Sequence, residues 1–378
     1  MEAMTLTSQK PVVLFVLHLP PPVHGAALMG QYVKESKVVN AAVEGHYINL
    51  TTAEDLADIG KGGLGKMGRF AKLLWTIRKK VKRLKPDLVY ITPNACGGAF
   101  YKDFVVVSLL KALGCRVVAH YHNQGVSTRQ NRWLDDHLYR CFFKGLKVIL
   151  LSERLYPDMQ KYVRREDVFI CPNGIPEASR EEMRLHHNVP RLLFLSNLIE
   201  SKGVLVLLDA CQLLLQRGCS FACDIVGAET NEIDKTRLER EIAQRGLQER
   251  VTYRGALYGN AKRSAFAEAD LFVFPSYYPE ECFPLVLLEA MQQGVPCITS
   301  PMGGIADIVE DGVTGLLAEK RNAASFADCI ERLLLNPTLR LQMGEEGYLR
   351  YKSLFTLPVF EQRMKEILLK ISLGGGKN

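Results

Sequence analysis

The sequence predicts an α/β protein made of two domains, each with a parallel β-sheet covered by helices. The chain of 378 residues is long enough for two domains of ordinary size. Short apolar runs alternate with helical patterns along it, which is typical of strand–helix–strand crossovers in parallel sheets. The alternation breaks near residues 171–176 and then restarts, so the domain boundary is expected there.

The first half of the chain predicts one complete sheet. Its first apolar run, 12–17, is short, follows a weakly charged start that contains Glu2 and lacks a small-residue cleavage site. It is therefore interpreted as a buried strand and not as a signal peptide. The expected strands are 12–17, 47–50, 88–92, 116–120, 148–151 and 168–171, with helices near 26–36, 67–84, 100–113, 130–144 and 153–163.

The second half predicts another sheet after a polar linker that runs to Pro190. No sequence repeat relates the two halves. Because ligands of open α/β sheets bind at the carboxyl ends of the strands, we expect the site in a cleft between the domains. The expected strands are 192–196, 222–226, 251–253, 271–274 and 297–299, with helices near 203–217, 232–245, 260–268, 284–293, 323–335, 338–352 and 357–372.

Composition excludes several classes of protein. Hydrophobic residues make up 47% and charged residues 24% of the chain, as in soluble globular proteins. No apolar run reaches the roughly 18 residues of a membrane-spanning helix. The ten cysteines include no Cys-x-x-Cys pair and have no histidine cluster beside them, which argues against zinc and for a reducing, cytoplasmic setting.

The net charge of +7 is concentrated in one segment. Residues 61–85 contain ten Lys or Arg and no acidic residue, and apolar residues recur there at helical spacing. One interpretation is a solvated helix that covers the first sheet. The other is docking of 66–85 on an anionic membrane surface, where each basic residue adds about 1 kcal/mol. No nucleic-acid partner is expected.

In the first domain, the candidate site residues follow strands. Gly25 begins a helix after a proline-rich loop, where backbone can approach an anion, although a structural turn glycine is the alternative. His120 and His122 follow the fourth strand and lie on the same face by alternation. His122, nearer the end, is the better site candidate, with a solvated loop histidine as the alternative.

In the second domain, three strand ends carry polar residues or glycine. Asn197, Lys202 and Gly203 follow the first strand. A lysine beside the free amides of a helix start suits a phosphate. Gly227 and Arg254 follow the next two strands.

Two carboxylates flank a further helix start in this domain. Glu281 precedes the helix and Glu289 lies more than one turn inside it. Pro284 suits the first helical position, so the amides of Leu285 and Val286 are expected to hold a phosphate. If the span were helical it would cover about 12 Å, roughly the length of a sugar, a diphosphate and a ribose. The alternative for Glu289 is an ordinary helix-face carboxylate.

This stretch resembles the signature of retaining glycosyltransferases of family 4, which have the two-domain fold called GT-B. The turn at 311–316, the Asn-Gly-Ile segment at 173–175 and the Lys-Gly pair at 202–203 also match. The resemblance covers essentially the whole chain and is strongest over 190–320. The matching positions are Pro275, Ser276, Glu281, Phe283, Leu285, Glu289, Ala290, Met291, Gly294, Pro296, Gly303 and Gly304.

The resemblance implies a glycosyltransferase that retains anomeric configuration and needs no metal or other cofactor. It would move a sugar from a nucleotide-diphosphate sugar to a saccharide or lipid-linked acceptor in cell-envelope polysaccharide or lipopolysaccharide synthesis. The enzyme would be cytoplasmic, with peripheral attachment to the inner face of the membrane as a further option. Residues 1–175 would form the acceptor-side domain, with a closing helix at 356–378 that returns to it, and residues 176–355 the donor domain.

The resemblance also implies roles for individual residues. Glu289 would bind the ribose, Glu281 the transferred sugar and Lys202 the diphosphate. Gly25 would approach the diphosphate and His122 would lie over the sugar. The expected catalytic residues are His122, Glu281 and Lys202, and the expected donor-binding residues are Gly25, Asn197, Lys202, Gly227, Arg254, Glu281, Phe283, Leu285, Val286 and Glu289.

Several positions depart from the family pattern. Asn197 stands where the family usually has Arg, Cys282 replaces a usual Gly, Pro284 occupies a position often held by Gly, and Asp307 stands for Glu. The chain has no Asp-x-Asp. Two other classes remain open at this stage: a related-fold epimerase or phosphorylase, and a non-catalytic nucleotide-sugar-binding partner.

Overall fold

The structure is a computed structural model that describes residues 10–51, 64–179 and 189–374. The chain divides into two compact units. The N-terminal unit comprises residues 1–172 together with 358–378, and the C-terminal unit comprises residues 173–357. The sequence placed these divisions after residues 175 and 355.

The N-terminal unit contains a six-stranded sheet in the order β2-β1-β3-β4-β5-β6. All its neighbouring strands pair in parallel, as predicted. The strands are β1 (Val12–Leu17), β2 (Glu44–Asn49), β3 (Leu88–Ile91), β4 (Val117–His120), β5 (Lys147–Leu150) and β6 (Val168–Ile170).

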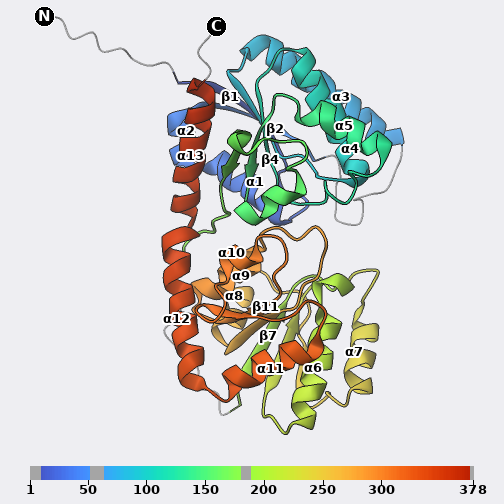
Figure 1. The fold of residues 1–378 in the computed structure, drawn as a ribbon, viewed down its shortest axis with the longest axis vertical. Helices are drawn as coiled ribbons and strands as arrows, with labels where there is room; N and C mark the ends of the chain where they lie inside the picture. The colour runs from blue at the N-terminus through green and yellow to red at the C-terminus, as the bar shows by residue number, and fades with distance from the viewer. Residues whose placement is uncertain (1–9, 52–63, 180–188, 375–378) are drawn as a thin grey trace, which may run out of the picture. The chain divides into compact units, whose positions relative to one another are not determined.

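Helices cover both faces of this sheet. Figure 1 shows α3, α4 and α5 on one side and α1, α2 and α13 on the other. The closing helix belongs to this unit from residue 358 onward, as the fold class predicts, and Arg116 donates to the carbonyls of Ile371 and Ser372 in it. The helices are α1 (Gly25–Glu35), α2 (Lys37–Ala42), α3 (Leu64–Leu84), α4 (Gly97–Ala112), α5 (Trp133–Phe143) and α13 (Leu357–Leu373), with short 3-10 turns η2 (Glu153–Asp158) and η3 (Arg165–Asp167).

The C-terminal unit has a second parallel sheet, in the order β12-β11-β10-β7-β8-β9. Its strands are β7 (Arg191–Leu195), β8 (Ala222–Val226), β9 (Val251–Tyr253), β10 (Leu271–Phe274), β11 (Cys297–Thr299) and β12 (Gly315–Leu317). Its helices are α6 (Val204–Gln216), α7 (Lys235–Gln244), α8 (Gly259–Ala267), α9 (Leu285–Gln292), α10 (Ile305–Ile308), α11 (Ala323–Leu334) and α12 (Pro337–Leu354), with the 3-10 turn η4 (Glu200–Lys202). The sequence prediction missed β12 and α10.

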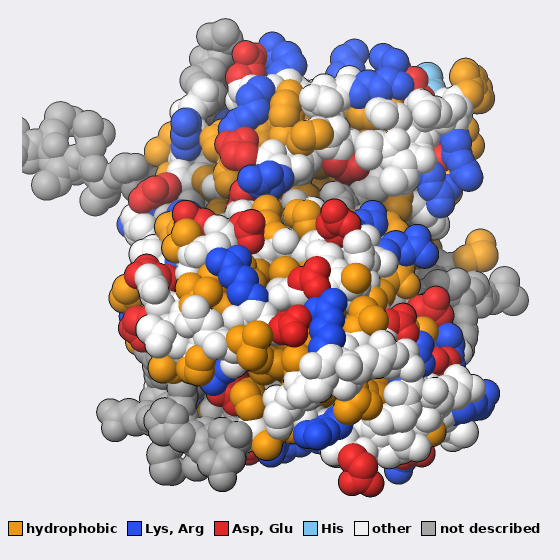
Figure 2. Space-filling view, turned by 60° about the horizontal axis from the view of Figure 1, so that its bottom comes forward, with side chains coloured by type: hydrophobic (Ala, Val, Ile, Leu, Met, Phe, Trp, Pro, Cys, Tyr) orange, Lys and Arg blue, Asp and Glu red, His pale blue; other side chains and the backbone are white. Residues whose placement is uncertain are grey.

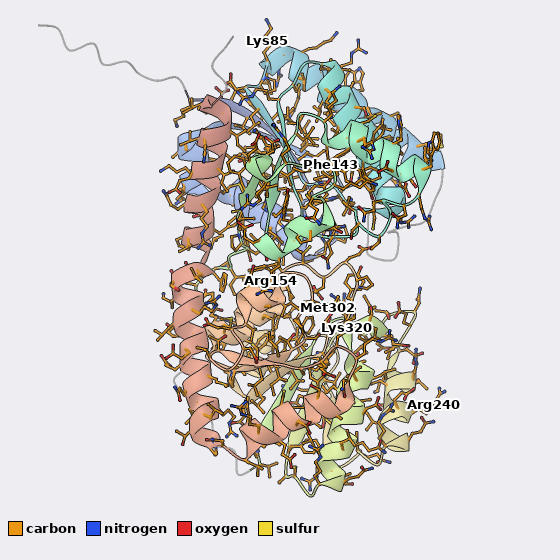
Figure 3. All side chains as sticks on the ribbon, viewed as in Figure 1. Lys85, Phe143, Arg154, Arg240, Met302 and Lys320 are labelled. Carbon is orange, nitrogen blue, oxygen red and sulfur yellow. The ribbon has the colours of Figure 1, made fainter. Side chains whose placement is uncertain are left out.

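The central strands are mostly apolar because each sheet is covered on both faces, whereas the edge strand β2 is largely polar and only partly buried. Every residue of β3, β4 and β10 is buried. Phe143 at the end of α5, labelled in Figure 3, is also buried and stacks on Tyr162 with 5.9 Å between ring centroids. On the face drawn in Figure 2, Lys and Arg side chains are interspersed with Asp and Glu.

The helix predicted at 153–163 is wrong. Only the 3-10 turn η2 forms there, and Pro157 inside it has no N–H to give to a longer helix. The carboxylate of Asp158 accepts hydrogen bonds from the amides of Gly125, Val126 and Ser127 at 2.9–3.0 Å. These hydrogen bonds fix the loop after β4, and the chain does not continue as a helix beyond η2.

Pro284 is not the first helical residue. Its ψ of 122° is extended, so it is the N-cap and α9 begins one residue later, at Leu285. The first amides of α9 still have no acceptor inside the helix, as at any helix start.

Candidate functional site

In the C-terminal unit, the site is built around Glu281, which lies in the loop after β10. Its buried carboxylate accepts a hydrogen bond from Lys202 Nζ at 2.6 Å and another from Ser276 Oγ at 3.0 Å. The Lys202 ammonium also lies over the ring of Tyr278, 4.4 Å from its centroid. Lys202 comes from the loop after β7, the strand that pairs with β10, so two neighbouring strand ends meet at this ion pair.

Glycines let the surrounding backbones approach one another. Gly303 has a φ of +53°, and a Cβ on it would lie 2.0 Å from the carbonyl oxygen of Glu281. Gly304 N donates to the carbonyl oxygen of Cys282 at 2.7 Å. A Cβ on Gly203 would lie 2.1 Å from the carbonyl oxygen of Pro275. The loops after β7, β10 and β11 are therefore in direct backbone contact, which fixes the position of Glu281.

Helix α9 continues the site from Glu281. Glu289 lies on its second turn, and Lys262 Nζ from α8 donates to its Oε1 at 2.7 Å and lies 2.7 Å from Oε2. Burial raises the pKa of Glu289, and the Lys262 ammonium opposes that rise. No motif in the sequence indicates Lys262, because 27 residues separate it from its partner and no spacing pattern joins them.

Phe283 lies between the two carboxylates along the chain. Its ring is buried and packs edge-on against Phe355, with 5.7 Å between centroids. Its carbonyl oxygen accepts a hydrogen bond from Asn173 Nδ2 at 3.3 Å. The Phe283 side chain therefore belongs to the interior of the unit, while Leu285 and Val286 begin α9 and are partly exposed.

Three of the predicted residues follow β7, β8 and β9. Asn197 is exposed. A Cβ on Gly227 would lie 1.7 Å from the carbonyl oxygen of Ser196, so protein backbone alone accounts for this glycine. Arg254 makes ion pairs with Asp224 at 3.2 Å and Glu268 at 3.1 Å. Beside it is a pocket of about 510 Å³ lined by Ala228, Glu229, Lys235, Tyr253, Arg254, Gly255 and Ala256.

The two candidates of the N-terminal unit lie at the carboxyl end of its sheet. Gly25 is exposed at the start of α1, with open space where a Cβ would be. The preceding His24 caps α1, since its Nδ1 accepts a hydrogen bond from Ala27 N at 3.3 Å. The ring of His122 lies 4.3 Å from that of His120, which confirms that the two face the same side.

These histidines are neutral at pH 7. Burial lowers the pKa of His122 to about 3, with the nearby His24 as a further cause. Burial and the positive charge of Lys102 lower the pKa of His18 to about 3. His120 is buried, and its Nδ1 lies 2.6 Å from the hydroxyl oxygen of Tyr90.

The predicted residues thus fall into two groups. Lys202, Glu281 and Glu289 are brought together around the start of α9, whereas Gly25 and His122 belong to the N-terminal unit. Among the described residues, no group of three or more His, Cys, Asp or Glu side chains is arranged to hold a metal ion. None of the described helices is long and apolar enough to cross a membrane.

Comparison with known proteins identifies the family. Residues 175–350 match the family described as glycosyl transferases group 1. The chain is 28% identical over 318 residues to the alpha-D-kanosaminyltransferase of Streptomyces kanamyceticus, which covers 76% of this chain and 79% of the relative. It is 30% identical over 236 residues to the amylovoran biosynthesis glycosyltransferase AmsK of Erwinia amylovora, which covers 59% of this chain and 56% of the relative.

The fold is also shared with solved structures. HepE of Anabaena in complex with UDP-glucose superposes with a TM-score of 0.72 at 19% sequence identity, covering 95% of this chain and 99% of that chain. This likeness shows the GT-B arrangement of two Rossmann-like domains. Residues 175–350 therefore form a glycosyl transferases group 1 domain, and the chain is a glycosyltransferase.

Proposed function

We propose that this glycosyltransferase belongs to the retaining family 4. It would transfer a sugar from a nucleotide-diphosphate sugar to a saccharide or lipid-linked acceptor in cell-envelope polysaccharide or lipopolysaccharide synthesis. The observation that carries this proposal is the pair of lysine–carboxylate contacts, Lys202 with Glu281 and Lys262 with Glu289, at the start and on the second turn of α9.

The chemistry of these groups suits a nucleotide sugar. Carboxylate oxygens accept hydrogen bonds from hydroxyls, so Glu281 is assigned to the transferred sugar and Glu289 to the ribose. The first amides of α9 point along the helix axis and favour an anion, so Leu285 and Val286 are assigned to the diphosphate together with Lys202.

Cleavage of the sugar–phosphate bond leaves a nucleoside diphosphate with an additional negative charge. Lys202 and the α9 amides are preorganised donors for that charge, the kind of stabilisation that contributes most in many enzymes. Because these donors can stabilise the leaving group, we propose that transfer proceeds without a metal ion. Roles for Gly25 at the diphosphate and His122 at the sugar are proposed on the family resemblance.

The base is assigned to the pocket beside Arg254. Because Asp224 and Glu268 engage the Arg254 guanidinium, recognition of the base is assigned to the other lining groups of the pocket. These are Glu229, Lys235, the ring of Tyr253 and the backbone of Gly255 and Ala256. HepE binds UDP-glucose, which supports a uridine nucleotide as the first donor to test.

An acceptor from polysaccharide synthesis is supported by AmsK, whose name places it in amylovoran biosynthesis. The N-terminal unit adds a surface that suits an anionic membrane. The exposed face of α3 carries only basic charges, including Lys72, Arg78 and Arg83. Both tryptophans of the chain are exposed in this unit, Trp75 on α3 by 61% and Trp133 on α5 by 82%.

Exposed tryptophan beside basic side chains is typical of surfaces that lie at a membrane–water interface. Lys79 Nζ lies 5.0 Å from the centroid of the Trp75 ring, so the two kinds of side chain are directly adjacent. We therefore propose that the enzyme works in the cytoplasm, at the inner face of the membrane, where a lipid-linked acceptor is found.

A donor panel tests the proposed activity. The protein is incubated with UDP- and GDP-sugars and with saccharide or lipid-linked acceptors, and the released nucleoside diphosphate and the product anomer are measured. We expect release that depends on the acceptor, retention of the donor's anomeric configuration by NMR and full activity after chelation with EDTA. An inverted product contradicts retention, and loss of activity with EDTA contradicts the metal-independent step.

A further inference from the structure

We infer that Lys262 is a positioning residue that holds Glu289 as a double hydrogen-bond acceptor for the two ribose hydroxyls of the donor. This inference rests on the proposed function, because it takes the ribose as the ligand of Glu289. It adds a residue that neither the sequence motif nor the family resemblance indicated.

The geometry of the pair is specific. Lys262 is the fourth residue of α8 and Glu289 the fifth residue of α9. Lys262 Nζ is 2.7 Å from each carboxylate oxygen, so it lies across the carboxylate and not at one end of it. Both side chains are largely shielded from water, with 26% of Lys262 and 27% of Glu289 exposed.

Glu289 lies among apolar residues that favour its protonated form, and the Lys262 ammonium opposes that effect. Leu288 and Ala290 on either side of Glu289 are fully buried, and burial favours the protonated form of a carboxyl group. A protonated carboxyl presents a donor and fewer acceptor sites, whereas an ionised one offers about four lone-pair positions. The ammonium donates a hydrogen bond to Oε1, whereas Oε2 has no hydrogen-bond partner among the described residues and keeps its acceptor positions for neighbouring hydroxyls.

A vicinal diol is the ligand that such a carboxylate matches. The two hydroxyls of a ribose are adjacent, and each can donate one hydrogen bond to a free acceptor position of the carboxylate. Hydrogen bonds to a charged acceptor are stronger than neutral ones, and each is worth roughly 10- to 100-fold in affinity. Without Lys262, part of the protein would carry a neutral Glu289 and lose this advantage.

The test measures binding of UDP and 2′-deoxy-UDP by calorimetry at pH 5.5 and pH 7.5. We expect the wild type to bind UDP at least about 10-fold more tightly than 2′-deoxy-UDP. Lys262→Met should weaken UDP binding about 10-fold or more, with a larger loss at pH 5.5 than at pH 7.5. Lys262→Arg should restore most of the affinity, because the guanidinium supplies the same charge.

Two further variants separate positioning from a general effect on the unit. Arg263→Met removes an exposed positive charge from the next position of α8 and should leave UDP binding unchanged. In a Glu289→Gln background, Lys262→Met should have no further effect on UDP binding, because Lys262 acts through Glu289. Melting curves for each variant confirm that binding is compared between folded proteins.

Three outcomes overturn the inference while the proposed function stands. These are unchanged UDP binding in Lys262→Met, a loss that is the same size at both pH values, or a loss that persists in the Glu289→Gln background. Wild-type protein that binds neither UDP nor GDP, under conditions in which it is folded, contradicts the proposed donor class itself and the inference with it.

Discussion

Lys202 and Glu281 form a buried ion pair, with 2.6 Å between Nζ and Oε2, that joins the loops at the ends of β7 and β10. The carboxylate is further fixed by Ser276, and the ammonium lies over Tyr278. A carboxylate with both neighbours in place needs no rearrangement to receive a sugar hydroxyl. The ion pair is therefore expected to contribute both to the stability of the C-terminal unit and to the proposed chemistry.

Removal of Lys202 should therefore affect stability as well as activity. Lys202→Met leaves the Glu281 charge buried without its cation, which typically costs about 3 kcal/mol or more. Urea unfolding measures this loss, and Lys202→Met combined with Glu281→Gln should recover much of it. The matched control is Arg237→Met at the more exposed pair with Glu200, where we expect a change of about 1 kcal/mol or less. Equal losses at the two sites would contradict the structural role of Lys202.

A methyl group at Gly303 should distort the Glu281 loop. The new Cβ would lie 2.0 Å from the Glu281 carbonyl oxygen, at a φ of +53°. We expect Gly303→Ala to destabilise the protein by about 3 kcal/mol and to abolish sugar transfer. Gly246→Ala is the control, because its φ is +68° and nothing lies within 4 Å of the added Cβ. That variant should lose only about 1 kcal/mol and keep its activity, and similar behaviour of the two variants would rule out the close approach.

The partly buried, neutral His122 predicts a loss of stability in acid. The pKa of His122 is lowered to about 3 in the folded state, against about 6.5 when unfolded. Between these values the unfolded chain binds a proton that the folded chain does not, so this contribution is complete above pH 6.5 and is lost as the pH falls. His122→Asn should reduce the slope of unfolding free energy between pH 6 and pH 4 by about 1 kcal/mol per pH unit. Parallel slopes for the two proteins in urea titrations would show that His122 does not titrate in this way.

The strands were predictable because buried strands are rich in apolar residues, which can be recognised in the sequence. In β1, β8, β9, β10 and β11 the predicted and observed bounds coincide, since each is a short run rich in apolar or β-branched residues. The strand β12 has three residues and begins with Gly315, so it has no comparable signal.

The candidate site residues could be selected from the sequence only where they belong to a recognisable motif, such as a polar residue or glycine that follows a strand. Glu281 and Glu289 were selected in this way, whereas Lys262 reaches Glu289 through packing of α8 on α9 and cannot be inferred from spacing. The ion pairs of Arg254 also follow from tertiary packing, because Asp224 and Glu268 come from other elements.

The basic surface of α3 predicts salt-dependent binding to anionic vesicles. Each basic residue contributes about 1 kcal/mol, so Arg78→Gln with Arg83→Gln should weaken binding roughly 30-fold. The control replaces Arg240 and Lys320, two exposed basic residues of the C-terminal unit that are labelled in Figure 3, with Gln. Liposome flotation compares the two variants on neutral and anionic vesicles. Equal flotation of wild type on both kinds of vesicle would leave α3 as a solvated helix that covers the sheet.

The central claim is that the stretch from Glu281 to Glu289 binds the nucleotide sugar, and Glu289→Ala tests it most directly. Calorimetric titration with UDP and GDP is performed on wild type and variant, with circular dichroism to confirm that both are folded. The account predicts that wild type binds at least one of the two nucleotides and that folded Glu289→Ala loses this binding and all sugar transfer. Near-normal nucleotide affinity and transfer in Glu289→Ala would contradict it.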